Sequence, residues 1–278
     1  MRFLRIIIPI AAALVLSGTI GMFMYERSKS EPPVITAVGG KNESVVSCKV
    51  TDEELVKLVT ARDSKDGDLS DKITVQRNMF FTSPGCASVI FAVCDSDNNV
   101  SKLNYSLKYS DYKPPEIRII NDLIVKRRSS VSLINHFSVE DCIDGDITNK
   151  LKVISADYNS SVAGEYTANC KVTNSYGDTR DMDVKILVTD EKFTADIALT
   201  EHSIYVPVGT TPDFASYISS VRNSEGYSYR TSDIAIDASG YNPNEAGIYS
   251  VFYSIKSTDG DGNAALTRIF VIVENGED

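Results

Sequence analysis

The stretch DSKDGDLSDKI, at Asp63–Ile73, returns later in the chain as DCIDGDITNKL, at Asp141–Leu151. Both copies carry three aspartates and a glycine in the order Asp-x-x-Asp-Gly-Asp, followed by one apolar residue and one hydroxyl residue. Two such similar segments, separated by about 80 residues, predict an internal repeat, and a repeat decides the architecture of a chain.

A second marker occurs three times. A glycine preceded by proline or alanine stands before a run of alternating apolar residues, at Pro84-Gly85, Ala163-Gly164 and Ala246-Gly247. Alternation with period two indicates a strand that has one face in the core. Turn-forming residues and a closing strand follow each run, the closing strands lying at 103–107, 184–188 and 269–273. Short strands and turns at regular spacing predict an all-β chain of tandem antiparallel β-sandwiches.

The domain boundaries follow from proline pairs and from the repeat. Pro32-Pro33 and Pro114-Pro115 stand at the start of the first two copies. Proline blocks helix formation and stiffens the chain, so these pairs are suited to the joins between domains. We expect sandwich domains at 32–111, 112–190 and 191–278, joined end to end as an extended row. One helical turn is expected in the first copy, with Thr51 as N-cap and Glu54 completing a capping box.

The N-terminus carries the longest apolar run of the chain. Ile6–Tyr25 is uncharged over 20 residues and follows Arg2 and Arg5. At 1.5 Å per residue this run would span about 30 Å, the thickness of a bilayer core. The fold prediction therefore begins with one N-terminal transmembrane helix, a signal anchor at 1–25, and a juxtamembrane linker at 26–31. A cleaved signal peptide and a buried core helix are the alternatives.

Composition excludes some functions. The chain of 278 residues has a formal net charge of −10, which disfavours binding to the phosphate backbone of nucleic acids. It has two histidines and no tryptophan, and it lacks a G-x-S-x-G elbow and a P-loop. His136 is expected to be a loop residue and not a catalytic base. We therefore predict a protein that is not an enzyme and that has no cofactor.

Taken together, the motifs of the copies resemble the bacterial surface Ig-like domain, a family also found in the pesticidal crystal protein Ig-like group. The likeness covers residues 32–278. Its motif residues are Ala61, Asp63, Asp66, Gly67, Asp68 and Pro84-Gly85 in the first copy, Asp141, Asp144, Gly145, Asp146, Gly164 and Tyr166 in the second, and Gly247, Tyr249 and Gly262-Asn263 in the third. Two positions depart from the pattern: Ala87 stands where tyrosine belongs, and Asn223–Tyr227 replaces the acidic segment in the third copy. The resemblance implies an Ig-like fold, and it leaves the function open because such modules serve as spacers, adhesins and enzyme appendages.

The aspartate clusters are the candidate metal sites. Three carboxylates within six residues are hard oxygen donors that suit Ca²⁺ if they converge. The predicted ligands are Asp63, Asp66 and Asp68 in the first copy and Asp141, Asp144 and Asp146 in the second. Their spacing is not that of an EF-hand loop. The alternative is a structural turn, because Asp-Gly-Asp is good turn chemistry without an ion.

Five cysteines leave at least one thiol unpaired, even where disulfides are allowed. Cys142 and Cys170 are the only pair confined to the second copy; Cys86 and Cys94 of the first copy are too far apart along one predicted strand to bridge each other. The alternative for Cys170 is a small buried apolar residue, since it has the core parity of its strand.

The anchor and the resemblance together predict a location and a role. We expect a single-pass membrane protein of the bacterial cell surface, with its C-terminal part extracytoplasmic, acting as a non-enzymatic spacer or adhesive stalk. Its partners would be the membrane, through the N-terminal helix, and a protein or glycan ligand of unknown identity. The alternative role is an accessory subunit of an envelope machine for polysaccharide export or wall remodelling.

Overall fold

The computed structural model describes two compact units, Met1–Tyr112 and Lys113–Asp278. The described residues are 4–29, 31–78, 80–155, 157–223, 230–257 and 263–276; within the first helix the side chains of 12–22, 24 and 25 are described.

Helix α1 (Leu4–Lys29) covers the apolar N-terminal run. Among the described residues, no helix is both long enough and apolar enough to span a bilayer. The side chains of residues 1–11 and 23, which belong to the expected signal anchor at 1–25, lie outside the described part. The transmembrane helix of the fold prediction is therefore not confirmed.

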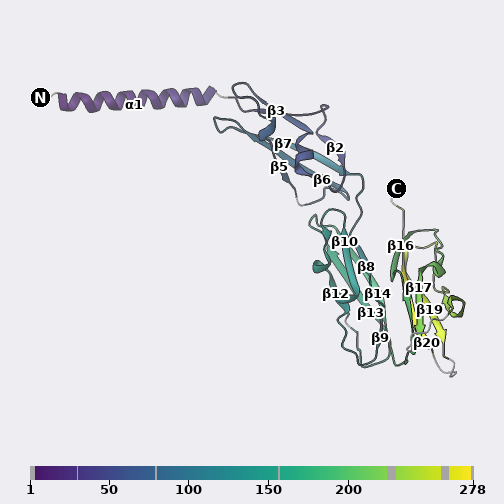
Figure 1. The fold of residues 1–278 in the computed structure, drawn as a ribbon. Helices are drawn as coiled ribbons and strands as arrows, with labels where there is room; N and C mark the ends of the chain where they lie inside the picture. The colour runs from purple at the N-terminus through teal and green to yellow at the C-terminus, as the bar shows by residue number, and fades with distance from the viewer. Residues whose placement is uncertain are drawn as a thin grey trace. The chain divides into compact units, whose positions relative to one another are not determined.

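Residues 34–109 form the first sandwich, whose two sheets enclose one apolar core (Figure 1). One sheet has the order β1-β3-β4 and the other the order β2-β7-β6-β5. The strands are β1 (Val34–Ala37), β2 (Glu43–Val46), β3 (Val59–Asp63), β4 (Gly67–Asp68), β5 (Thr74–Arg77), β6 (Cys86–Cys94) and β7 (Val100–Tyr109). Two short helices complete it, α2 (Asp52–Val56) and the 3₁₀ turn η1 (Ser70–Lys72). The capping box of α2 between Thr51 and Glu54 is present, as predicted.

Residues 116–189 form the second sandwich with the same connectivity. Its sheets have the orders β11-β10-β8 and β12-β13-β14-β9. The elements are β8 (Glu116–Ile119), β9 (Ile124–Lys126), η2 (Leu133–His136), β10 (Phe137–Asp141), β11 (Gly145–Asp146), η3 (Thr148–Lys150), β12 (Lys152–Ile154), β13 (Gly164–Thr173) and β14 (Thr179–Thr189). His136 thus ends a 3₁₀ turn.

Residues 195–274 form the third sandwich, with sheets β15-β17 and β16-β20-β19-β18. The elements are β15 (Ala195–Leu199), β16 (Ser203–Pro207), η4 (Phe214–Tyr217), β17 (Ile218–Asn223), η5 (Thr231–Asp233), β18 (Ala235–Asp237), β19 (Gly247–Lys256) and β20 (Asn263–Glu274). The all-β prediction is confirmed for these strands.

Each sandwich contains one parallel strand pair, so the prediction of purely antiparallel sheets is wrong in this respect. The parallel pairs are β2 with β7, β9 with β14, and β16 with β20. The physical reason is a crossover. The first strand of each sandwich lies in the smaller sheet, and the chain then crosses to the free edge of the larger sheet, beside the closing strand, where it runs in the same direction.

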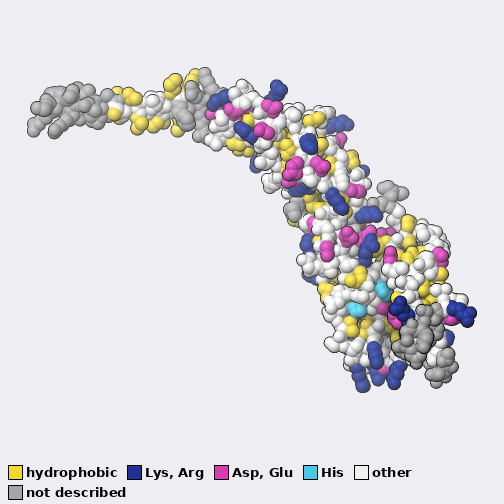
Figure 2. Space-filling model, viewed as in Figure 1, with side chains coloured by type: hydrophobic (Ala, Val, Ile, Leu, Met, Phe, Trp, Pro, Cys, Tyr) yellow, Lys and Arg dark blue, Asp and Glu magenta, His cyan; other side chains and the backbone are white. Residues whose placement is uncertain are grey.

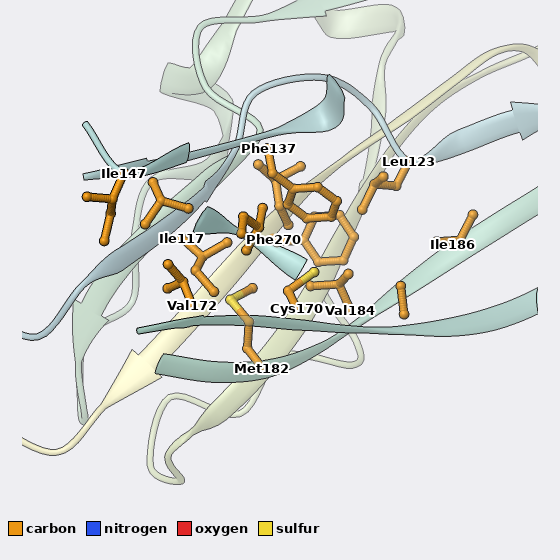
Figure 3. Packing of buried hydrophobic residues seen from close by; sticks show 14 of the residues in the cluster. Ile117, Leu123, Phe137, Ile147, Cys170, Val172, Met182, Val184, Ile186 and Phe270 are labelled. Carbon is orange, nitrogen blue, oxygen red and sulfur yellow. The ribbon is translucent and has the colours of Figure 1, made fainter. Parts of the chain in front are cut away.

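The second and third sandwiches pack side by side within one unit, so the expected end-to-end row is wrong for this pair (Figure 1). Strand β20 is buried along nearly its whole length. Ile269, Val271 and Val273 face the core of the third sandwich, while Phe270 lies in the core of the second. Figure 3 shows the Phe270 ring beside Phe137 and Cys170. The two sandwiches therefore share apolar packing and form one body.

Polar contacts reinforce this seam. Arg268, whose side chain is buried, donates from Nη2 to the carbonyl oxygens of Leu123 and Lys185. Thr267 Oγ1 donates to the Asp122 carboxylate at 2.7 Å. Burial lowers the pKa of Arg268 to about 10, which leaves the guanidinium charged at neutral pH. An arginine in this position stabilises the seam only while its carbonyl partners stay in place.

Candidate functional site

The first aspartate of each cluster closes an Asx turn. Asp63 Oδ1 accepts hydrogen bonds from the backbone N–H groups of Lys65 and Asp66, at 2.7 and 2.8 Å. Asp141 Oδ1 accepts in the same way from Ile143 and Asp144, at 3.0 and 2.8 Å. This turn brings the following glycine to a positive φ, 77° at Gly67 and 71° at Gly145. Glycine is the residue that adopts this conformation without strain, which explains its place in the motif.

The third aspartate accepts hydrogen bonds from the first residue of the 3₁₀ turn that follows. Asp68 Oδ1 accepts from the N–H and Oγ–H of Ser70, at 3.0 and 2.6 Å. Asp146 Oδ1 accepts from the N–H of Thr148 at 2.9 Å. Hydrogen bonds from these hydroxyl residues lower the pKa of both carboxyl groups below its ordinary value. The hydroxyl residue of the motif is thereby explained as well.

The middle aspartate joins the cluster to a distant turn. The Asp66 carboxylate accepts from Ser96 N–H and Oγ–H, at 2.7 and 2.8 Å. Asp144 accepts from Ser175 N–H and Oγ–H, at 2.7 and 2.5 Å. Hydrogen bonds from Ser96 lower the pKa of Asp66; at Asp144 burial raises the pKa, and the bonds from Ser175 and Lys150 outweigh it. The motif thus connects the acidic turn to the turn between the two long strands of each sandwich.

The carboxylates of a cluster therefore bind three separate sets of donors and do not converge. Among the residues that the structure describes, no group of three or more His, Cys, Asp or Glu side chains could hold a metal ion. Calcium at the six aspartates stays a prediction, and these hydrogen bonds favour the structural turn. The six residues are Asp63, Asp66, Asp68, Asp141, Asp144 and Asp146.

One position differs between the two copies in a way that the motif did not indicate. In the second sandwich Asn174 Nδ2 donates to Asp141 Oδ2 at 3.1 Å, and both side chains are buried. In the first sandwich Asp95 occupies the place of Asn174 and has no donor to offer. Asp63 Oδ2 is buried and has no hydrogen-bond partner. The signal was present in the sequence, since Asp95 and Asn174 begin the two equivalent turns.

The third copy cannot be compared in the same way. Residues 224–229, which hold most of the altered acidic segment, and 258–262, which hold most of its turn, lie outside the described residues.

The motif tyrosines are corner residues. Tyr166 OH donates to the carbonyl oxygen of Val162 at 2.9 Å, and Tyr249 OH donates to that of Glu245 at 3.0 Å. A Cβ added at Gly247 would lie 3.2 Å from the Tyr249 hydroxyl oxygen, so the glycine makes room for the ring. In the first sandwich the partner is Tyr112, whose ring would lie 3.1 Å from a Cβ at Gly85. A tyrosine from further along the chain thus occupies the space that Ala87 leaves.

The cysteines and histidines show no catalytic arrangement. None of the five cysteines, all of which lie in the described part of the chain, forms a disulfide, so the Cys142–Cys170 pairing is not present. Cys170 is a buried apolar residue, and burial raises the pKa of its thiol to about 12. The Nδ1 atoms of His136 and His202 are buried and without a hydrogen-bond partner. No carboxylate therefore accepts a hydrogen bond from Nδ1 of either ring, as the aspartate of a catalytic triad does from its histidine.

A cavity of about 310 Å³ lies at the seam of the second and third sandwiches. The segment before β8, the beginning of β14 and the ends of β16 and β20 form its walls. Its lining includes Arg180, Tyr205, Glu274 and the three prolines Pro114, Pro115 and Pro207. Sequence reasoning missed this cavity, because its walls meet only when the two sandwiches pack together.

Comparison with known proteins gives limited likenesses. No family model matches the chain. The chain is 25% identical over 221 residues to the pesticidal crystal protein Cry22Aa of Bacillus thuringiensis, a match that covers 77% of this chain and 29% of that protein. The chain thus spans less than a third of the length of this relative.

Among solved structures, one similar chain holds the CBM51-2 domain, in complex with GlcNAc, and INT domains of Clostridium perfringens ZmpB, with 18% identity and a TM-score of 0.29 over 58% of this chain and 42% of that one. Another is Drosophila N-cadherin EC1-3, with 10% identity and a TM-score of 0.30 over 89% and 91%. Identities and scores this low do not decide a function. The sequence match with a pesticidal crystal protein is compatible with the resemblance described above and suggests a bacterial β-sandwich family.

Proposed function

We propose that this chain is a non-enzymatic surface protein built of three tandem Ig-like sandwiches, which holds a binding surface outside the membrane as a spacer or adhesive stalk. The apolar run Ile6–Tyr25 would anchor it, with Arg2 and Arg5 on the cytoplasmic side. The bulk of the chain would then lie outside the cell.

The observation that carries this proposal is that the aspartates repeated in the first two sandwiches serve the structure of their turns. In each of the first two sandwiches the first and third motif aspartates accept hydrogen bonds within their own turn. The middle aspartate accepts from a serine of the distant turn, Asp66 from Ser96 and Asp144 from Ser175, and we call this contact the clamp. Such clamps stiffen a module without providing a reactive group. A stiff, repeated module with its acids committed to turns suits a display or spacer role.

The charge distribution supports a partner other than nucleic acid. On the face shown in Figure 2, basic and acidic side chains are interspersed over the first sandwich. Ion pairs such as Lys65–Asp97, at 2.8 Å, use some of the basic groups. Over the first sandwich this face therefore offers no continuous basic surface to a phosphate backbone.

Protease treatment of intact cells tests the proposal. We expect residues 31–278 to be cleaved from the outside, and the N-terminal fragment to stay with the membrane and to keep Met1–Tyr25. Protection in intact cells together with cleavage in lysed cells would overturn the surface location. A mature N-terminus between Gly18 and Met24 would show a secreted protein without the anchor.

Crosslinking in cells followed by affinity purification separates the two roles. Capture of an external protein or glycan supports the spacer or adhesive role. Stoichiometric capture of an envelope enzyme would instead support the alternative, an accessory subunit of an export or wall-remodelling machine.

A further inference from the structure

The cavity at the seam of the second and third sandwiches has rigid walls. Tyr205 OH donates to the carbonyl oxygen of Ile117 at 2.8 Å, which holds the ring in place. Arg180 lies over the Tyr205 ring, with its Cζ 5.5 Å from the ring centroid, and forms an ion pair with Glu274. The three prolines named above limit backbone motion around the opening. A ligand would therefore meet a preformed site and would not have to order it.

Arg180, in the lining of the cavity, also has a donor without a partner. Arg180 Nε is buried and has no hydrogen-bond partner. A buried donor without an acceptor is costly, so an oxygen placed beside Arg180 would be favoured. Lys113, also in the lining, forms no salt bridge within the described part of the chain.

The charges of the lining select the kind of ligand. The lining contains two cationic residues, Lys113 and Arg180, and two carboxylates, Glu116 and Glu274. Arg180 is ion-paired with Glu274, and Glu116 is ion-paired with Arg118. The two carboxylates would repel an anionic ligand, and the two cationic side chains would repel a cationic ligand. A hydroxyl group meets none, because it donates to a carboxylate and accepts from a guanidinium or an ammonium. The prolines and the Tyr205 ring add apolar surface that suits the C–H face of a sugar ring.

We propose that this cavity binds a neutral saccharide of one or two rings, with Arg180 donating to a ring or hydroxyl oxygen and Glu274 accepting from a hydroxyl. A volume of about 310 Å³ lies at the lower end of the range for small-molecule sites, in keeping with so small a ligand. The inference deepens the proposed function, since it names the ligand class that the displayed unit would take.

Saturation-transfer NMR on the purified full-length chain tests it. The probes are glucose, N-acetylglucosamine, their β-1,4-linked disaccharides and glucuronic acid, each at up to about 10 mM, ten times a weak Kd of about 1 mM. We expect transfer to at least one neutral probe and weaker transfer to glucuronic acid. No transfer to any neutral probe would overturn the proposal, as would stronger binding of the acid.

Two variants locate the site. Arg180→Gln removes the guanidinium with its Nε–H and its positive charge, and should raise the Kd at least about tenfold. Gly276→Trp fills the cavity from its rim; a Cβ there meets open space, so this variant is expected to fold, and its melting temperature checks this. Arg127→Gln is the matched control, because Arg127 is ion-paired with Asp190 outside the lining.

Binding that survives both Arg180→Gln and Gly276→Trp would place the saccharide elsewhere and refute this site. The failure is distinguishable from failure of the proposed function, because protease accessibility on intact cells does not depend on saccharide binding.

Discussion

Replacing Asn174 by aspartate should destabilise the second and third sandwiches. In the native chain Asn174 Nδ2 donates to Asp141 Oδ2 at 3.1 Å. The two side chains are 5% and 2% exposed, so water cannot replace the lost donor. Asn174→Asp would set two carboxylates against each other. In the first sandwich Asp95 begins the equivalent turn and accepts through Oδ2 from Asn99 Nδ2, at 2.7 Å.

The magnitude follows from the burial. A buried acceptor without a donor costs about 1–3 kcal/mol, and repulsion between the carboxylates adds to this. For a unit of 150–250 residues each kcal/mol lowers the Tm by about 2–4 °C, so the expected loss is about 2–12 °C. A protonated carboxyl group would donate as the amide does. The deficit should therefore be present at neutral pH and shrink as the pH falls toward the ordinary Asp pKa of about 3.9.

Thermal unfolding of the full-length chain, followed by circular dichroism at several pH values, measures this. Asn149→Asp makes the same chemical change at an exposed position and should stay within about 0.5 kcal/mol of wild type. An Asn174→Asp Tm equal to that of Asn149→Asp would show that the Asp141 contact does not contribute, and the reasoning would be wrong.

Three further outcomes are expected. Asp95→Asn combined with Asn99→Asp gives the first sandwich the amide and the acid that the second has at Asn174 and Asp178. The new amide gives Asp63 Oδ2 a donor and should raise the free energy of unfolding in urea by about 1 kcal/mol. No gain would contradict the comparison of the two sandwiches. Phe270→Ala should cost about 3–5 kcal/mol of stability, and the second and third sandwiches should still unfold together in one calorimetric transition at a lower Tm. Two separate transitions would argue against a shared core. Addition of millimolar calcium at constant ionic strength should leave the Tm equal to that in chelator. A rise in Tm that Asp68→Asn abolishes would instead support the calcium site, because calcium at a hundred times its Kd would add about 2.7 kcal/mol of stability.

A pH effect belongs with these. The folded-state pKa values of four motif aspartates lie below their ordinary value: Asp66, Asp68, Asp144 and Asp146. Their contribution to the free energy of unfolding is therefore present above the unfolded pKa of about 3.9 and is lost as the pH falls through the folded pKa. Urea unfolding between about pH 5 and pH 2 should show stability falling with acidification, and a flat profile would contradict the assignment.

Local features of the fold could be predicted from the sequence because their causes lie within a few residues. Alternating apolar residues form strands β6, β13 and β19 in all three sandwiches. The capping box at Thr51 depends on one residue three positions away. The Asp-x-x-Asp-Gly-Asp segments form turns for a local reason too, since two of their three carboxylates accept from backbone N–H groups two or three residues further on.

The seam of the second and third sandwiches shows where local reasoning ends. Residues 269–273 are apolar without alternation, a pattern of a strand buried on both faces, and this signal was available in the sequence. It indicates a second covering layer but does not say which segment supplies it.

The sequence by itself determined the class of fold, the positions of the repeated turns and strands, and the residue types that such turns need. Only the tertiary structure decided that Phe270 completes the core of the preceding sandwich, that Asp63 Oδ2 lacks the donor that Asp141 Oδ2 has, and that Arg180, Tyr205 and Glu274 line one cavity. The reason is physical. Periodicity and turn chemistry act between neighbours along the chain, whereas these three features depend on contacts between segments about 30 to 150 residues apart, which exist only once the sandwiches have packed.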